Sequence, residues 1–262
     1  MESVGVTNCM CRFRIVWECM SVIEQPPACP ETPTAAITAE SLKDRVLHLD
    51  HDVLILDKPA GLLVHPGPRG QGSLSDFLPD LWFEMARPPA LAHRLDRDTS
   101  GCLVLGRHQK ALMKLGRLFS RGLADKTYWA VVRGAPPSAE GRIDLPLLKV
   151  LPETGGWRIR PDPEGLPAAT LYRLLGSGGG LSWLELRPLT GRTHQLRIHC
   201  ASIGTPIVDD PYYGDSAVPP AGPLHLLARS ITLPLRQDQP PIAAVAPPPA
   251  HMLADLAACG YL

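Results

Sequence analysis

Apolar side chains recur every three or four positions between residues 108 and 121, which predicts an amphipathic helix there. The apolar positions of this helix are Ala111, Leu112, Leu115, Leu118 and Phe119. A second helix is predicted from Thr193 to Ile203, because Gly204 then stands where a helix-ending glycine is expected. Shorter helices are predicted at 73–82, where a serine can cap the first turn, and at 250–258.

Short apolar runs, each bounded by glycine, proline or polar residues, predict β-strands. They lie at residues 53–56, 102–106, 127–134, 170–176, 181–188 and 224–235. Several of these strands follow one another directly, which favours an α+β fold with a mixed, largely antiparallel sheet over a doubly wound fold. Residues 93–101 are too polar for a strand interior and are predicted to form a loop, as is the proline-rich segment 237–249.

The first 40 residues show no period, and their segment QPPACPETPT cannot form a helix or a central strand. We therefore expect a flexible tail over residues 1–40 and a single domain over residues 41–262. Four of the seven cysteines lie in this tail, at Cys9, Cys11, Cys19 and Cys29. Their irregular spacing, with no histidine nearby, favours free thiols over a metal site.

Composition narrows the function classes. Of 262 residues, 45% are apolar and 20% charged, which suits a globular protein with a full core. No run approaches the roughly 18 apolar residues of a membrane span, so we expect no membrane partner. Lys+Arg and Asp+Glu are equal at 26 each, which excludes a uniformly basic protein that coats nucleic acid. The odd cysteine count, without CxxC spacing, argues against a disulfide scaffold and favours a cytoplasmic location.

Basic residues are nevertheless concentrated in one segment. Residues 87–133 hold ten basic and three acidic side chains, a net +7, whereas residues 1–86 carry a net −6. Five cations step by three and four positions, which places them on one face of the predicted helix. They are Arg107, Lys110, Lys114, Arg117 and Arg121. Most charge runs are solvated surface, but a face with no acid on it favours contact with a phosphate backbone.

Two polar segments could carry chemistry. HRLDRDTSG at 93–101 places Asp96 between two arginines, and LTGRTHQLR at 189–197 adds two more arginines with a histidine and a glutamine. A guanidinium beside a carboxylate favours its ionised form, and an ionised, positioned aspartate can act as nucleophile or base. Taken alone, an aspartate among arginines is more often a structural ion pair.

Two other chemistries remain open at this point. Asp96 and Asp98 could be a glycosidase-like carboxylate pair, although an aromatic content of only 5% disfavours a sugar platform. Histidines and aspartates could also bind a metal, but their spacing matches no compact motif. These residues are His93, His194, His199, His225, Asp209 and Asp210.

The two polar segments closely resemble the main signatures of the RluA-type RNA pseudouridine synthases, the second continuing as LTGRTHQLRIHCASIGTPIVDDPYYG. The segments DVLILDKPAGLLVHP, DKTYWAVVRG and LHLLARSITLP also fall where that family has matching pieces, so the resemblance covers about residues 45–235. It implies a pseudouridine synthase fold: one catalytic domain with a mixed, mainly antiparallel central sheet in two halves and a catalytic cleft between them. The tail is too short and proline-rich for an S4 RNA-binding domain, so the chain resembles the family's short form.

The resemblance also implies an activity and its residues. The family isomerises uridine in RNA to pseudouridine without a cofactor or a metal. Asp96 matches the family's essential aspartate, Tyr128 the tyrosine that stacks on the target base, and Arg197 the arginine that pairs with the aspartate. Arg94 matches an arginine that helps hold the RNA where the base leaves the stack. The full set of residues expected to bind RNA is Arg94, Arg97, Arg107, Lys110, Lys114, Arg117, Arg121, Lys126, Arg192 and His194.

We therefore expect a monomeric isomerase acting on ribosomal or transfer RNA. The alternative of another class is a catalytically silent RNA-binding protein on the same fold. Binding alone needs no carboxylate facing phosphates, so the presence of Asp96 favours the enzyme.

Overall fold

The computed structural model describes residues 37–66, 72–151 and 157–262 of the chain. Its centre is a ten-stranded sheet with the main order β1-β2-β4-β11-β5-β10-β9-β6, while β12 pairs with β11 and β3 with β4. The strands are β1 (Val46–Leu49), β2 (Val53–Lys58), β3 (Ala90–Leu91), β4 (Ser100–Gly106), β5 (Asp125–Arg133), β6 (Glu140–Asp144), β7 (Leu147–Val150), β8 (Arg158–Pro161), β9 (Ala169–Gly178), β10 (Leu181–Pro188), β11 (Leu226–Leu233) and β12 (Ile242–Val245). The helices are α1 (Ala39–Lys43), the 3-10 helix η2 (Leu74–Leu81), α2 (Gln109–Ser120), α3 (Gln195–Ser202) and α4 (Ala250–Ala258). Among the described strands of this sheet only β4 and β11 pair in parallel, which confirms the mixed, mainly antiparallel α+β fold.

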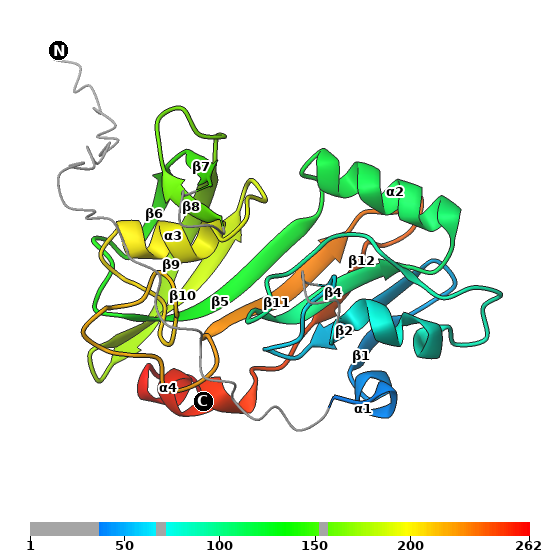
Figure 1. The fold of residues 1–262 in the computed structure, drawn as a ribbon, viewed down its shortest axis with the longest axis horizontal. Helices are drawn as coiled ribbons and strands as arrows, with labels where there is room; N and C mark the ends of the chain where they lie inside the picture. Colours follow the sequence, from blue (N-terminus) through cyan, green and yellow to red (C-terminus); the bar gives the residue numbers. More distant parts are fainter. Residues whose placement is uncertain (1–36, 67–71, 152–156) are drawn as a thin grey trace, which may run out of the picture.

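Strands β5 and β11 lie at the middle of the sheet and join its two halves (Figure 1). On one side of them, α3 packs on β10 and contributes to a core with Leu184 and Leu186. On the other side, α2 packs on β4 and shares a core with residues of β2, β11 and α4. The separate hairpin β7–β8 stands beside α3, where buried Ile159 contacts Ile198.

Strand alternation decides which face each side chain of β5 takes. Tyr128 is paired with Leu186 of β10, and Trp129 is paired with Glu185. Cross-strand partners share a face, so Tyr128 lies on the face that carries α3. Trp129 lies on the opposite face, where it packs edge-on against Trp183.

Most predicted elements are confirmed, with boundaries shifted by a few residues at most. The predicted strand 181–188 and the predicted helix 250–258 coincide with β10 and α4. The helix predicted at 73–82 is a 3-10 helix, and β12 forms inside the predicted proline-rich loop. Helix α1 begins at Ala39, and the part of the predicted tail up to residue 36, with its four cysteines, lies outside the described residues.

Candidate active site

The loop that carries Asp96 connects β3 to β4 and is fastened at several points. Leu95 is buried in the core beneath it, and the Thr99 amide donates to the carbonyl of Asp96. The loop leads into Gly101, which has φ +101° and approaches the carbonyl of Ala228 so closely that a Cβ would lie 2.3 Å from it. Only glycine fits there, so this residue lets β4 meet β11 directly after the polar loop.

Lys58, at the end of β2, anchors this loop through hydrogen bonds to backbone carbonyls. Its side chain is completely buried, and Nζ donates to the carbonyls of Pro59, Leu62 and Arg97 at 2.8, 2.9 and 2.8 Å. Burial lowers the pKa of Lys58 to about 7, whereas Asp98 and Asp96 act in the opposite direction. Sequence reasoning missed this residue; the signal was a lysine that ends a strand whose residues 53–56 form an apolar run.

Asp96 itself is half-buried, and besides Lys58 its charge acts on four further side chains. The carboxylate favours the protonated form of Tyr128 and Tyr213, and the charged form of His194 and Arg197. These groups come from β5, from the start of α3 and from the loop after it. The structure therefore brings the three predicted catalytic residues, Asp96, Tyr128 and Arg197, into one electrostatic neighbourhood.

Arg197 does not form its ion pair with Asp96, contrary to the expectation from the resemblance. Its guanidinium donates from Nε and Nη2 to the two carboxylate oxygens of Asp210, at 2.7 and 2.6 Å. Although burial opposes the charged form, these bonds raise the pKa of Arg197 above its ordinary value. Asp210 also accepts the amides of Tyr212 and Tyr213, at 2.9 and 3.0 Å. Asp210 thus holds the Arg197 guanidinium in position near Asp96. The Asp96 carboxylate takes no part in this bidentate ion pair.

Tyr128 borders a narrow pocket lined also by His93, Lys126 and Ser230. Burial, with a smaller contribution from Asp96, raises the pKa of Tyr128 well above its usual value. The hydroxyl therefore keeps its proton at neutral pH. Burial also lowers the pKa of His93 to about 4, so this ring is neutral; its Nε2 accepts the Val104 amide at 3.0 Å.

His194 occupies the residue before α3 with a left-handed backbone, at φ 55°. Its Nδ1 lies 2.9 Å from the hydroxyl of Tyr213, which also lies 3.4 Å from the carbonyl of Ile159 in the hairpin. Burial, followed by the charge of Arg197, lowers the pKa of His194 to about 4. A neutral imidazole therefore stands between Asp96 and the β7–β8 hairpin.

The predicted RNA-binding cations divide into exposed and engaged groups. Lys110, Lys114, Arg117 and Arg121 are exposed on or at the end of α2. Arg94, Arg97 and Arg192 are also exposed. Arg97 forms an ion pair with Asp98 at 2.9 Å, and Arg192 donates to the carbonyl of Pro167 at 3.1 Å. Lys126 is half-buried. All of these positions stay predictions as RNA contacts.

Arg107 is the exception, and its placement on the RNA-facing stripe was wrong. The residue precedes α2, because the side chain of His108 caps the helix, and it is buried. Its guanidinium donates to the carbonyls of Asp50, Trp82 and Phe83, the last at 2.6 Å. Arg107 thus links the loops that contain Asp50 and Phe83 through hydrogen bonds. Its buried guanidinium is not available to a phosphate.

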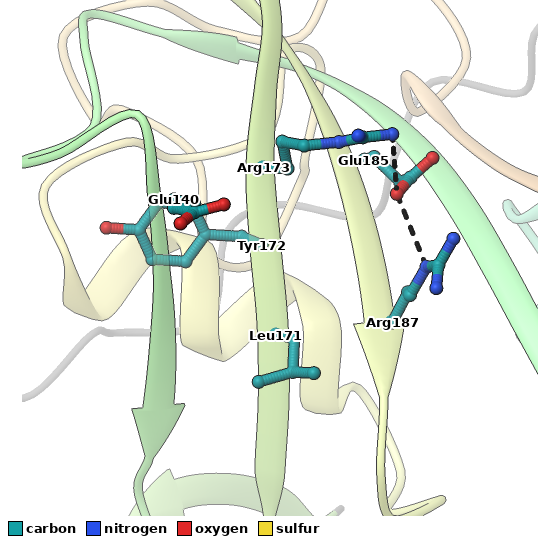
Figure 2. A pocket seen from close by; sticks show the side chains of 6 residues that line it. All are labelled: Glu140, Leu171, Tyr172, Arg173, Glu185 and Arg187. Atoms are coloured by element: carbon teal, nitrogen blue, oxygen red, sulfur yellow. Dashed lines mark hydrogen bonds and ion pairs between the residues drawn. The ribbon is translucent and has the colours of Figure 1, made fainter.

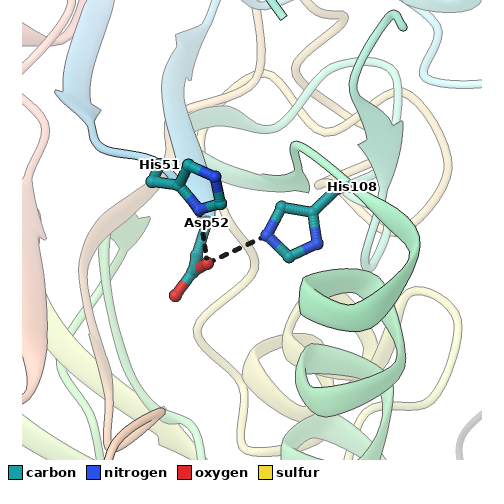
Figure 3. Close-up of side chains that lie close together, drawn as sticks. All are labelled: His51, Asp52 and His108. Carbon is teal, nitrogen blue, oxygen red and sulfur yellow. Dashed lines mark hydrogen bonds and ion pairs between the residues drawn. The ribbon is translucent and has the colours of Figure 1, made fainter. Parts of the chain in front are cut away.

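The histidines and aspartates weighed as metal ligands do not form a common cluster in the part of the chain that the structure describes. His51, Asp52 and His108 do lie together (Figure 3). Asp52 Oδ1 lies 3.1 Å from His51 Nδ1 and 2.9 Å from His108 Nε2, and Oδ2 accepts from Arg236 at 2.7 Å. Because His108 Nδ1 accepts the Ala111 amide, the ring proton sits on Nε2 and blocks its lone pair. This arrangement suits a capped helix end rather than a metal site.

A second surface pocket lies on β6, β9 and β10 (Figure 2). Glu185 joins two arginines there, Arg173 at 3.2 Å and Arg187 at 3.3 Å. Since Glu185 shares the face of Trp129, this pocket is on the side of the sheet away from Tyr128. It therefore does not contribute to the site around Asp96.

Comparisons with known proteins agree with this geometry. A family model described as RNA pseudouridylate synthase matches residues 52–202. The chain is 46% identical over 209 residues to an uncharacterized RNA pseudouridine synthase of Zymomonas mobilis, covering 79% of this chain and 95% of that protein. It is 38% identical over 216 residues to the mitochondrial RNA pseudouridine synthase 4 of Arabidopsis thaliana, covering 71% and 45%. The solved structure of human RNA pseudouridylate synthase domain containing 4 superposes with a TM-score of 0.71 at 27% identity, covering 84% of this chain and 95% of that one.

Proposed function

The chain belongs to the RNA pseudouridylate synthase family, whose members isomerise uridine in RNA, and on this premise we propose that Asp96 performs the reaction on ribosomal or transfer RNA. The observation that carries the proposal is the half-buried Asp96 beside Tyr128 and Arg197. Ribosomal and transfer RNA are proposed because both offer structured, looped uridines to a small cation-bearing enzyme. We also propose that the enzyme works as a monomer.

The reaction breaks the bond from C1′ to N1, rotates the uracil and joins C1′ to C5. The hydrogen on C5 is lost as a proton and N1 gains one, so the product is an isomer of the substrate. Asp96 could attack C1′, attack the uracil ring or remove a proton from C2′. Each path requires an ionised carboxylate that is positioned and not consumed by another partner. The pairing of Arg197 with Asp210 supports this requirement, because it engages the guanidinium elsewhere and leaves the Asp96 oxygens without this partner.

Tyr128 offers its ring to the target base and its hydroxyl to the proton on C5. Because the hydroxyl holds its own proton at neutral pH, it accepts the C5 proton only if its own proton leaves in the same step. The released uracil must stay in place until C5 reaches C1′, and a site that closes over the base provides that retention.

The uridine must also leave its stack before Asp96 can reach it, at a cost of a few kcal/mol. Exposed cations can offset this cost by holding the distorted backbone through its phosphates. Arg94 is exposed two residues before Asp96, which supports its proposed contact with the phosphate next to the target. Helix α2 packs on the face of the sheet that carries Trp129, opposite Tyr128, so its exposed cations are proposed to contact RNA away from the target uridine.

The test is release of tritium from RNA labelled at C5 of uridine. Transfer RNA and ribosomal RNA, both transcribed without modifications, are incubated separately with the wild-type protein. We expect release from one pool, which identifies the substrate class. Release from neither pool, while both RNAs bind, would contradict the proposed substrates.

A further inference from the structure

Three aromatic rings run outward from the site around Asp96, and the reaction itself leaves them unused. They are His194, Trp157 immediately before β8, and Tyr212 in the loop after α3; together they form what we call the aromatic row. The ring centroids of Trp157 and His194 are 5.3 Å apart, and those of His194 and Tyr212 are 6.0 Å apart. These are contact distances for aromatic pairs, so the row is one continuous surface assembled from three separate segments.

The outer members of the row are exposed to a degree that is unusual for such large side chains. Trp157 is 44% and Tyr212 is 45% exposed, in a chain with only five tryptophans and five tyrosines. Exposed aromatic surface gathered in one place marks a binding site more often than chance, since burying it would otherwise stabilise the fold. The rings touch one another, so a ligand reaches their open faces and does not slide between them.

Cations fix the rings in position before any ligand arrives. The Nζ of Lys149 lies 5.1 Å from the Trp157 ring, and the guanidinium of Arg197 lies 5.2 Å from the Tyr212 ring. The backbone of Tyr212 is held by Asp210, at 2.9 Å from its amide nitrogen. Rings that are already ordered lose little conformational freedom on binding, which favours affinity.

The position of the row identifies its ligand. His194 feels the charges of both Asp96 and Arg94, so the row begins beside the reacting nucleotide. Lys149 and Arg94 are exposed there and can reach phosphates. Aromatic faces flanked by cations are what single-stranded nucleic acid binds, because every base has a π-face and every linkage a negative charge. In a duplex those faces are covered by neighbouring base pairs.

We propose that Trp157 and Tyr212 stack on unpaired bases flanking the target uridine, so that the enzyme selects uridines in single-stranded or looped RNA. The inference rests on the proposed function, since it assumes that the site at Asp96 takes RNA. It assigns a binding role to Trp157 that is separate from the chemistry of Asp96 and Tyr128.

The test measures the Kd of a fluorescein-labelled single-stranded RNA, and of the same RNA annealed to its complement, by fluorescence anisotropy. Loss of one stacked base costs about 1–3 kcal/mol, so we expect Trp157→Ala and Tyr212→Ala each to weaken single-strand binding by about 5- to 150-fold. Trp157→Phe should recover part of the loss. Duplex affinity and the salt dependence of single-strand binding should stay unchanged, because stacking releases no counterions.

The matched control is Trp82→Ala, which removes a tryptophan that is 53% exposed at the end of η2. A loss for Trp157→Ala no larger than for Trp82→Ala, or an equal loss on the duplex, would overturn the proposal. Tritium release by the wild type distinguishes a failure of the proposed function from a failure of the proposed role of the aromatic row. Absence of release from every RNA pool counts against the proposed function, whereas release combined with unchanged binding by Trp157→Ala counts against the aromatic row alone.

Discussion

The buried pair of Arg197 and Asp210 makes a quantitative prediction. The side chains are 2% and 0% exposed, and two short hydrogen bonds join them. Asp210→Asn keeps the size of the side chain but leaves the guanidinium without a counter-charge in a buried place. Removing one partner of such a pair costs about 3–5 kcal/mol, because the remaining charge is neither hydrated nor neutralised. With a urea m-value of about 2 kcal/mol/M, the unfolding midpoint should fall by about 1.5–2.5 M.

The chain provides a matched control in Arg142 and Asp144. These two residues form the same bidentate contact, at 2.6 and 2.9 Å, but their side chains are 55% and 61% exposed. Water solvates both charges, so Asp144→Asn should move the midpoint only slightly. The assay is urea unfolding followed by circular dichroism for wild type and both variants. Equal shifts for Asp210→Asn and Asp144→Asn would refute the reasoning that burial makes the first pair indispensable.

Three further predictions concern the buried Lys58, the hydroxyl of Tyr128 and the exposed cations of α2. The lowered pKa of Lys58 means that, at this site, the unfolded chain binds more protons than the folded one from about pH 7 upward, so the Lys58 contribution to stability should rise with pH. Between about pH 7 and pH 9, below the range in which the buried thiols titrate, urea midpoints of the wild type should rise relative to those of Lys58→Met; a parallel pH dependence of the two proteins would contradict the assignment. Tyr128→Phe should still bind RNA but release tritium from C5 far more slowly, and a normal rate would remove the hydroxyl from the mechanism. Changing Lys110, Lys114 and Arg117 together to Ala should reduce the slope of log Kd against log salt by about 0.7–0.9 for each phosphate that the variant no longer neutralises, whereas an unchanged slope would make α2 ordinary solvated surface.

Elements whose signal is local were predictable from the sequence. The apolar run of β10 and the helical period of α2 are carried by the residues of those segments alone. Strand β12 escaped prediction because its proline-rich flanks indicate a loop, while the pairing with β11 that makes it a strand is a tertiary interaction. The hairpin β7–β8 consists of four-residue strands that no period can reveal.

The site shows the same division between local and tertiary information. Asp96, Tyr128 and Arg197 were predicted as catalytic because the segments that carry them resemble those of a known family, and the structure brings the three residues near one another. The partner of Arg197 was assigned to the wrong aspartate, since Asp210 is brought to it only by the turn after α3. Arg107 was assigned to a helical face by its spacing, but the helix begins two residues later and its side chain turns inward.

No local pattern joins the members of the aromatic row, which come from a hairpin, a helix start and a loop. Its recognition required the arrangement of those three segments around Asp96.

The described residues also contain no helix long and apolar enough to cross a membrane. This finding agrees with the absence of long apolar runs in the sequence.

The central claim is that Asp96 carries out the isomerisation, and the most direct measurement compares wild type with Asp96→Asn. Both proteins, in excess over RNA labelled with tritium at C5 of uridine, are followed through a single turnover, and RNA binding is measured in parallel. We predict that Asp96→Asn binds the RNA as wild type does and releases no tritium, because the amide is neither a nucleophile nor a base. Tritium release by Asp96→Asn at the wild-type rate would contradict the account.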